Sequence, residues 1–378
     1  MRTVSRTSSS SLLLLRGGGR KLVAAAATIV AASTSFPATA HAAGAFTPPN
    51  PFGRTALVLA GGGAKGAYTV GVLETICKSS ELANSWDLVT GTSIGAMNAA
   101  ALAQFKKKDQ CGKGIPAMKT FWTSVKKLSD VFTSNSGDGA ECPSTYDALS
   151  AASSFFSNGG MCSSDVGEAN LRKAINVADI AKSDVELQVV ATNLRTGDST
   201  WWNGDDPKIF EGVMASAAIS PVAKPRYAEY EEAATGRRRT DYFVDGGLLH
   251  NAPLLRALER GASKAIVVLL DPAESPGIDV VGIKANETDR LGGMVLYFYW
   301  QVIQSQLFLH GELESACKDF PTAEIVGYIP NGTVGGILDF NEPAIDKMMA
   351  KGAYEAATVG GPIDLCAAYG LSRGKVPA

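Results

Sequence analysis

The stretch that decides the fold opens with RTALVLAGGGAKG (residues 54–66) and closes with WDLVTGTSIG (residues 86–95). In both segments a short apolar run leads into glycines, and a segment with helical spacing follows. We therefore predict strands over 54–60 and 86–90 and helices over 64–77 and 94–105. Strands that alternate with helices in this order predict an α/β fold with a mostly parallel sheet.

The rest of the chain continues the same pattern after one interruption. Residues 106–166 are rich in Ser, Gly and Lys, and we predict an insertion of short helices and loops there. Further strands are predicted over 185–193, 199–202, 242–244, 265–270 and 323–329, and further helices over 211–218, 253–260, 287–318 and 343–357. We expect one domain over 54–366, followed by a C-terminal tail over 367–378.

Composition excludes several classes of protein. Of the 378 residues, 46% are hydrophobic and 19% are charged, which is typical of a globular chain and not of a disordered one. The formal charge of −2 argues against nucleic-acid binding, because phosphate backbones select basic surfaces. The chain has only three histidines and neither a zinc spacing nor an EF-hand loop, so we expect no metal and no cofactor.

The first 43 residues are predicted to be a targeting segment. They carry five positive charges and no acidic residue, and their apolar run over 22–32 precedes Ala40-His41-Ala42. This pattern predicts a signal peptide cleaved near Ala42, a linker over 44–53 and a secreted, periplasmic or secretory-lumen protein. The alternative is a transit peptide to an organelle. We expect no transmembrane span in the mature chain, since polar residues interrupt the apolar stretch 291–309.

All six cysteines lie beyond the targeting segment, and an even number in an exported protein permits disulfides. They are Cys77, Cys111, Cys142, Cys162, Cys317 and Cys366. Their spacing does not determine how they pair. Arg237, Arg238 and Arg239 are predicted to form a solvated hairpin turn, with contact to phosphate head-groups as the alternative.

The motif Gly91-Thr92-Ser93-Ile94-Gly95 indicates a nucleophilic serine. In G-x-S-x-G the serine occupies a sharp turn between a strand and a helix, so its hydroxyl is exposed. Gly91 and Gly95 flank it where a Cβ would clash with nearby backbone. The predicted strand before the motif and helix after it supply this context, and Ser93 is the candidate nucleophile.

The glycine-rich loop at 61–66 allows two interpretations. As G-x-G-x-x-G it fits a dinucleotide site, which requires an acidic residue about 20 positions later at the end of the next strand. Glu81 and Asp87 precede or open that strand, and Ser93 follows it. We therefore favour an oxyanion hole built from backbone N–H groups. Its candidate residues are Gly61, Gly62, Gly63, Ala64, Lys65 and Gly66.

A third motif, Asp245-Gly246-Gly247, would in isolation indicate only a turn. With GGGAKG and GTSIG before it, the chain resembles the patatin-like phospholipase family over roughly residues 54–330. The resemblance implies a three-layer α/β/α fold and a catalytic dyad without histidine. Ser93 would then be the nucleophile and Asp245 the general base, while the 61–66 loop would hold the oxyanion. Lys65 stands where many relatives carry arginine, and the 106–166 insertion matches no family motif.

A Ser–Asp–His triad is the alternative to the dyad. Ser93, Asp245 and either His250 or His310 occur in the chain order of α/β-hydrolases. His250, however, lies five residues after Asp245, which leaves little room for separate roles, and His310 ends an apolar helix. The residues therefore favour the dyad.

We accordingly predict a serine lipid acyl hydrolase that acts through an acyl-enzyme. By resemblance, its substrate is a phospholipid, a lysophospholipid or a neutral acyl lipid at a membrane or micelle surface. Two alternatives stay open at this point. One is a nucleotide-binding α/β protein that uses the Gly61–Gly66 loop, and the other is a non-catalytic lipid-binding relative.

Overall fold

The computed structural model describes residues 53–78, 85–137, 139–142, 148–231, 238–273, 293–358 and 361–375. The predicted signal peptide over 1–43 lies outside these residues, and so does the linker up to residue 52. Arg237 is outside them as well.

One mixed sheet organises the described part of the chain. Its strands are β1 (Arg54–Leu59), β2 (Leu88–Thr92), β3 (Glu186–Asn193), β4 (Ser199–Asn203), β5 (Arg226–Glu231), β6 (Arg238–Asp245), β7 (Ala262–Val268), β8 (Glu324–Tyr328) and β9 (Ile363–Asp364). They lie in the order β5-β6-β3-β2-β1-β7-β8-β9, and β4 also pairs with β3. The central run β3-β2-β1-β7-β8 is parallel throughout, whereas β4, β5, β6 and β9 pair antiparallel with their neighbours. The predicted mostly parallel α/β sheet is confirmed.

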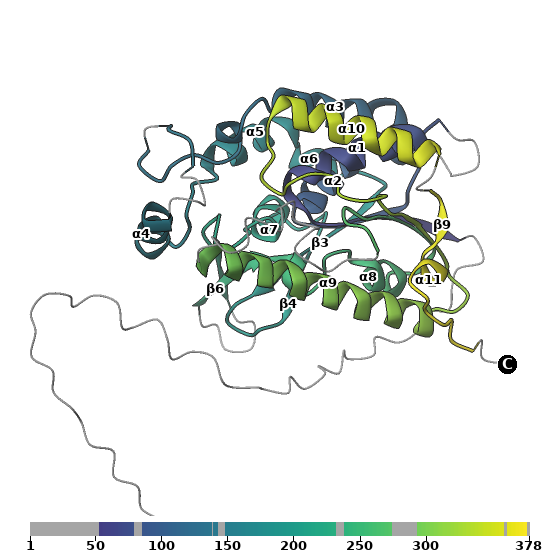
Figure 1. The fold of residues 1–378 in the computed structure, drawn as a ribbon. Helices are drawn as coiled ribbons and strands as arrows, with labels where there is room; N and C mark the ends of the chain where they lie inside the picture. The colour runs from purple at the N-terminus through teal and green to yellow at the C-terminus, as the bar shows by residue number, and fades with distance from the viewer. Residues whose placement is uncertain are drawn as a thin grey trace, which may run out of the picture. The chain divides into compact units, whose positions relative to one another are not determined.

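Helices cover both faces of this sheet. They are α1 (Gly66–Ile76), α2 (Ile94–Ala103), α3 (Ile115–Ser124), α4 (Ala148–Asn158), α5 (Asp165–Ala174), α6 (Val177–Ile180), α7 (Ile209–Ser216), α8 (Leu254–Glu259), α9 (Gly293–Asp319), α10 (Glu342–Ala357) and α11 (Leu365–Ala368). Figure 1 shows α1, α2, α3 and α10 on one face, and α8 and α9 on the other. The folded unit therefore has three layers, with the sheet in the middle.

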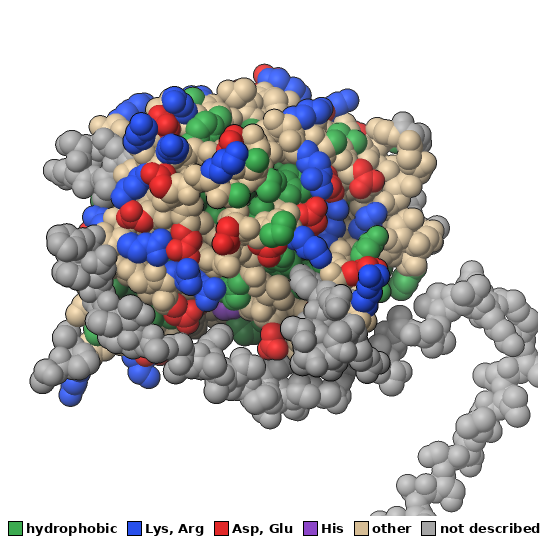
Figure 2. Space-filling view, turned by 180° about the vertical axis from the view of Figure 1, so that it is seen from behind, with side chains coloured by type: hydrophobic (Ala, Val, Ile, Leu, Met, Phe, Trp, Pro, Cys, Tyr) green, Lys and Arg blue, Asp and Glu red, His purple; other side chains and the backbone are tan. Residues whose placement is uncertain are grey.

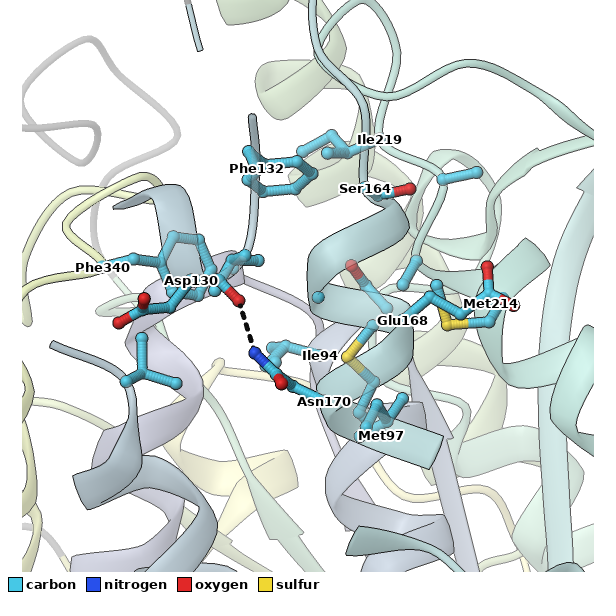
Figure 3. Close-up of a pocket in the computed structure, with 18 of the residues that line it drawn as sticks. Ile94, Met97, Asp130, Phe132, Ser164, Glu168, Asn170, Met214, Ile219 and Phe340 are labelled. Carbon is cyan, nitrogen blue, oxygen red and sulfur yellow. Dashed lines mark hydrogen bonds between the residues drawn. The ribbon is translucent and has the colours of Figure 1, made fainter. Parts of the chain in front are cut away.

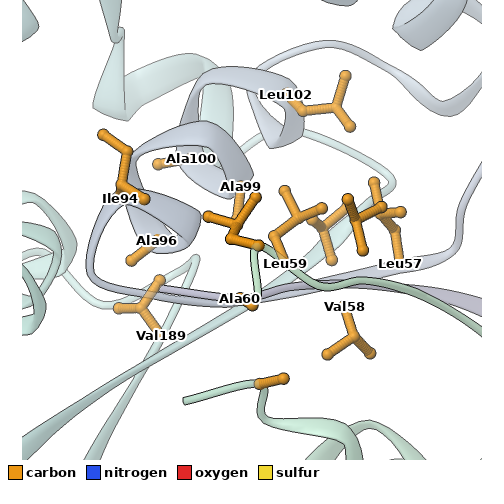
Figure 4. Close-up of a cluster of buried hydrophobic side chains, with 14 of the residues drawn as sticks. Leu57, Val58, Leu59, Ala60, Ile94, Ala96, Ala99, Ala100, Leu102 and Val189 are labelled. Carbon is orange, nitrogen blue, oxygen red and sulfur yellow. The ribbon is translucent and has the colours of Figure 1, made fainter. Parts of the chain in front are cut away.

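Part of the core lies where α2 packs on β1. Leu57, Leu59 and Ala99 are fully buried on the α2 side, and Val58 points to the opposite face of the sheet (Figure 4). Because β1 is covered on both faces, its sequence is a continuous apolar run and not an alternating one. The alanines of α2 let this helix approach the strand closely, which fixes the position of the residue at its N-terminus.

The sheet extends further than predicted at one edge. The expected strand at 242–244 is the end of the longer β6, and β5 beside it was not predicted at all. The sequence of β5, RYAEYE, consists of charged and aromatic residues with a single alanine, as suits an edge strand that is half exposed. Such a strand lacks the apolar run by which buried strands are recognised. The proposed turn at 237–239 is also revised in part, because Arg238 and Arg239 belong to β6.

Three disulfides pair all six cysteines: Cys77–Cys111, Cys142–Cys162 and Cys317–Cys366. The first joins the 106–166 insertion to Cys77 at the end of α1, and the second cross-links two positions within the insertion. The described residues of the insertion form short helices and loops as expected. The third joins the end of α9 to α11.

Helix α9 contains the described part of the apolar stretch 291–309, and its burial varies along the helix. Leu309 and Leu313 are buried, but Trp300 and Leu307 are each more than half exposed. Among the described helices we find none with the length and apolar character to cross a membrane. On the face shown in Figure 2, Lys and Arg side chains are interspersed with Asp and Glu, and an apolar area lies between them.

Candidate active site

Ser93 lies at the turn between β2 and α2 with φ of 56°, and it is the one non-glycine residue with positive φ among the described residues. A side chain held in this conformation costs about 1–3 kcal/mol and persists where the surrounding structure enforces it. The enforcement comes from the flanking glycines. A Cβ on Gly91 would lie 2.2 Å from the carbonyl oxygen of Gly95, and a Cβ on Gly95 would lie 2.2 Å from that of Leu59. The turn therefore packs directly on backbone and presents Ser93.

The sheet register brings Asp245 to Ser93 although 152 positions separate them. Thr92, the last residue of β2, pairs with Val190 of β3, and Asp245, the last residue of β6, pairs with Ala191 of the same strand. The two strands thus end beside β3 at adjacent positions. The Ser93 hydroxyl donates a hydrogen bond to Asp245 Oδ2 at 2.5 Å.

Burial makes Asp245 a stronger proton acceptor than a surface aspartate. Its side chain is 7% exposed, and this burial raises the pKa of Asp245 to about 6. Hydrogen bonds from the Ser93 hydroxyl and, at 2.8 Å, from the Gly247 N–H to Oδ1 oppose the shift, because they stabilise the carboxylate. The carboxylate is therefore ionised at neutral pH, yet basic enough to accept a proton from a bound serine.

Neither histidine of the alternative triad bonds to Ser93 or Asp245. The His250 ring pairs through Nδ1 with Glu312 of α9 at 3.0 Å, and only its backbone carbonyl contacts the elbow, through the Thr92 hydroxyl. The His310 ring lies edge-on to Tyr369 with the ring centroids 6.1 Å apart. The geometry therefore brings together a serine and an aspartate alone.

Four of the six N–H groups in the 61–66 loop already donate hydrogen bonds within the protein. These groups belong to Gly61, Ala64, Lys65 and Gly66, and their respective acceptors are carbonyls of Asn251, Ile337, Gly62 and, for Gly66, Gly63 with Ala64. The N–H groups of Gly62 and Gly63 donate to no acceptor in the described part of the chain. Both glycines line cavities that Ser93 also lines. The structure thus narrows the candidate oxyanion donors from six to two.

Lys65 has a partner that sequence reasoning missed. Its side chain is 1% exposed, and its ammonium pairs with Asp271, which also accepts a hydrogen bond from Gln306. Asp271 follows β7, the strand beside β1, so it stands at the carboxyl edge of the parallel sheet, where ligand-binding residues collect. An acidic residue directly after a predicted buried strand was the signal that could have identified it.

Two cavities of different character meet at Ser93. The first spans about 850 Å³, part of it open to solvent, and is lined mostly by apolar side chains of α2, the insertion and the 337–340 segment (Figure 3). The second spans about 560 Å³, also partly open to solvent, and a larger share of its lining residues have polar side chains, among them Lys65, Asp245 and Asp271. The sequence did not predict that the insertion forms the wall of the first cavity.

A family model described as patatin-like phospholipase matches residues 57–258, just over half of the chain. The matched span contains all three motifs with Ser93, Asp245 and the 61–66 loop.

Individual relatives are distant. A cGAMP-activated phospholipase of Escherichia coli is 25% identical over 220 residues, which cover 52% of this chain and 52% of that protein. A patatin-like phospholipase domain-containing protein of Pyricularia oryzae is 27% identical over 177 residues, which cover 46% of this chain and 20% of that protein. The chain thus spans about half the length of the first relative and a fifth of the second. The crystal structure of VipD from Legionella pneumophila is 13% identical, with 81% of this chain and 68% of that one covered and a TM-score of 0.33.

Proposed function

The chain belongs to the patatin-like phospholipase family, and on that premise we propose that it hydrolyses carboxylic esters of acyl lipids with Ser93 as nucleophile and Asp245 as general base. The observation that carries the proposal is the 2.5 Å hydrogen bond between Ser93 Oγ and the buried Asp245 carboxylate. A serine hydroxyl becomes nucleophilic when an adjacent base accepts its proton. No other base bonds to this hydroxyl among the described residues.

The proposed reaction has two stages. Asp245 Oδ2 takes the proton of Ser93 as Oγ attacks the ester carbonyl carbon, and the negative charge that forms on the carbonyl oxygen is stabilised by the N–H groups of Gly62 and Gly63. The intermediate then collapses, the C–O bond to the alcohol breaks, and Asp245 returns the proton to the leaving alcohol. Water attacks the acyl-Ser93 ester by the same steps in reverse order and releases the fatty acid.

We also propose that the mature protein is exported after cleavage near Ala42 and meets its lipid at a membrane or micelle surface. The pairing of all six cysteines supports export, because disulfides form and persist in oxidising compartments. N-terminal sequencing of the protein purified from its native source tests this: an intact residue 1 would contradict cleavage.

The function is tested by labelling with a fluorophosphonate probe, which reacts with activated serines. We expect the wild-type protein to be labelled on Ser93 and the Ser93→Ala variant to be unlabelled. Ser124→Ala is the matched control, because Ser124 is exposed on α3 outside both cavities. Folded wild-type protein that is not labelled on Ser93 would refute the hydrolase. Thermal stabilisation of such unlabelled protein by NAD or NADP would favour the nucleotide-binding alternative.

A further inference from the structure

The two cavities at Ser93 differ in the share of polar side chains that line them, which is larger in the second cavity. We call the first the apolar cavity and the second the polar cavity. We propose that the apolar cavity binds a single acyl chain and that the polar cavity binds a hydroxylated, uncharged alcohol group through the side-chain amide of Asn251. This inference rests on the proposed function, since it assigns the two sides of the ester that Ser93 would attack. It names the substrate class as monoacyl esters of a polyol.

The apolar cavity offers a chain no unsatisfied polar group among its described side chains. Glu168 and Ser164 on its wall both bind Arg226, at 2.7 and 2.9 Å. The side-chain amide of Asn170 donates to the carbonyl oxygen of Asp130 at 3.1 Å (Figure 3). Because these groups already have partners, what remains for a ligand is apolar surface, which favours an alkyl chain.

The cavity follows the first turns of α2 away from Ser93. Ile94 and Met97 both line it, and Met97 lies about 6 Å along the helix from Ser93 at 1.5 Å per residue. Opposite them the insertion contributes Phe132, which packs edge-on against Phe340 with ring centroids 6.0 Å apart. A chain attached at Ser93 would thus run between α2 and the insertion, so side chains there determine which chain lengths fit.

The polar cavity is not suited to an anion beside Ser93. The Lys65 ammonium is neutralised by Asp271, and Asp245 adds a further negative charge. The other polar side chains described in its lining, among them Ser305 and Gln306, are uncharged. Uncharged hydroxyl groups fit such a lining, whereas a phosphate directly at the ester would meet net negative charge.

Asn251 is the group in this cavity that points to a ligand. It is 7% exposed, and its side-chain amide has no hydrogen-bond partner among the described residues. A Cβ built on Gly61 would lie 2.7 Å from Asn251 Oδ1 and 3.1 Å from Ser93 Cβ, so the amide and the nucleophile flank the same point. The amide faces the cavity without a protein partner, so it is free to exchange hydrogen bonds with a substrate hydroxyl.

The alcohol side is tested with two octanoate esters, 1-octanoyl glycerol and methyl octanoate. They share the acyl chain and differ in the hydroxyls of the alcohol. In Asn251→Leu, which removes the amide but keeps the volume, we expect KM for the glycerol ester to rise about ten-fold more than KM for the methyl ester. Asn251→Ser places a hydroxyl, a smaller hydrogen-bonding group, at this position. We expect its KM for the glycerol ester to lie between those of the wild type and of Asn251→Leu.

The acyl side is tested with p-nitrophenyl acetate and dodecanoate. Met97→Trp fills the cavity, and we expect its kcat/KM to fall about ten-fold or more further for dodecanoate than for acetate. Tyr354→Trp is the matched control, because Tyr354 is 64% exposed on α10 and lines neither cavity. If thermal melting shows that Met97→Trp is not folded, Met97→Phe is used in its place.

Failure of the inference and failure of the proposed function give different results. If Ser93 reacts with fluorophosphonate but Asn251→Leu changes KM equally for 1-octanoyl glycerol and methyl octanoate, the assignment of the polar cavity to the alcohol is overturned. The hydrolase then still stands. If folded Met97→Trp has kcat/KM lowered equally for p-nitrophenyl acetate and dodecanoate, the assignment of the acyl cavity is overturned and the hydrolase stands. If wild-type Ser93 does not react at all, the proposed function itself fails.

Discussion

The catalytic edge of the sheet and the wall of the apolar cavity meet at Ser93, but they tolerate change very differently. At the edge, Gly91 and Gly95 lie against backbone so closely that an added Cβ would come within 2.2 Å of a carbonyl oxygen. In the insertion, a Cβ on Gly112, which does not line the cavity, would meet nothing within 4 Å, whereas a Cβ on Gly167 in the cavity wall would lie 2.7 Å from the Val131 carbonyl oxygen. The proposed chemistry thus depends on backbones in contact, which few residues permit, whereas most of the wall consists of apolar side chains.

The largest effect is expected from removal of the base at the edge. Asp245→Asn keeps the shape but cannot accept the Ser93 proton, so we expect kcat to fall by about three orders of magnitude or more. Initial rates on p-nitrophenyl butyrate measure this. Activity within ten-fold of the wild type would show that another group takes the proton.

The difference between the tightly packed Gly95 and the open Gly112 can be tested by measuring the stability of an alanine variant at each position. Gly95→Ala forces a Cβ onto the Leu59 carbonyl, and we expect it to lower the free energy of unfolding by about 3 kcal/mol or to prevent folding. Gly112→Ala adds a methyl in open space within a helical segment, so it should leave stability unchanged or raise it by about 0.5–1 kcal/mol. Chemical unfolding of both variants measures the difference, and equal destabilisation would contradict the contrast.

The pH dependence of kcat/KM is expected to come from Asp245 at the edge of the sheet and not from residues in the wall of the apolar cavity. Protonated Asp245 cannot act as a base, and its pKa is raised to about 6 by burial. We therefore expect kcat/KM to fall about ten-fold per pH unit below that value and to level off above it. The same acid limb should appear with p-nitrophenyl acetate and dodecanoate. If the midpoint of the fall in kcat/KM at low pH changed with the length of the acyl chain, the titrating group would lie in the wall of the cavity and not at Asp245.

The smallest effect on activity is expected from loss of the Cys142–Cys162 disulfide beside the cavity wall. Cys142–Cys162 closes a span of 20 positions, and Cys162 is followed two residues later by Ser164 of the cavity. The double variant Cys142→Ser/Cys162→Ser should lose about 3 kcal/mol of stability. We expect it also to lose a few-fold more activity on dodecanoate than on acetate.

Cys317→Ser/Cys366→Ser is its control, since that disulfide lies away from both cavities. It should lose stability without a change in chain-length preference. A change of preference in both double variants would show that the effect is global and not specific to the wall.

The same contrast explains what the sequence could predict. The α/β order and the residues Ser93 and Gly61–Gly66 follow from local patterns, because close backbone contacts demand glycine at fixed spacing beside buried strands. Asp245 needed the family resemblance, since its own motif indicates only a turn. Which two of the six loop N–H groups remain available could not be predicted, since two of the acceptors, the carbonyls of Asn251 and Ile337, lie far away in the chain.

The wall of the apolar cavity, by contrast, could not be recognised from any local sequence pattern. Its apolar residues come from separate segments, such as Met97 in α2, Phe132 in the insertion and Phe340 near the C-terminal end. Each is unremarkable in its own segment, and only the tertiary fold brings them together. The edge strand β5 was missed for a related reason, because its residues are polar and its place is fixed by pairing with β6.

We propose that Asp245 activates Ser93 without a histidine. The most direct test compares the rate at which a fluorophosphonate labels Ser93 in His250→Gln and in Asp245→Asn. His250 pairs with Glu312 and not with Ser93, so we expect His250→Gln to be labelled within about three-fold of the wild-type rate and Asp245→Asn to be labelled at least about 100-fold more slowly. Loss of labelling in folded His250→Gln, or normal labelling in Asp245→Asn, would contradict the dyad.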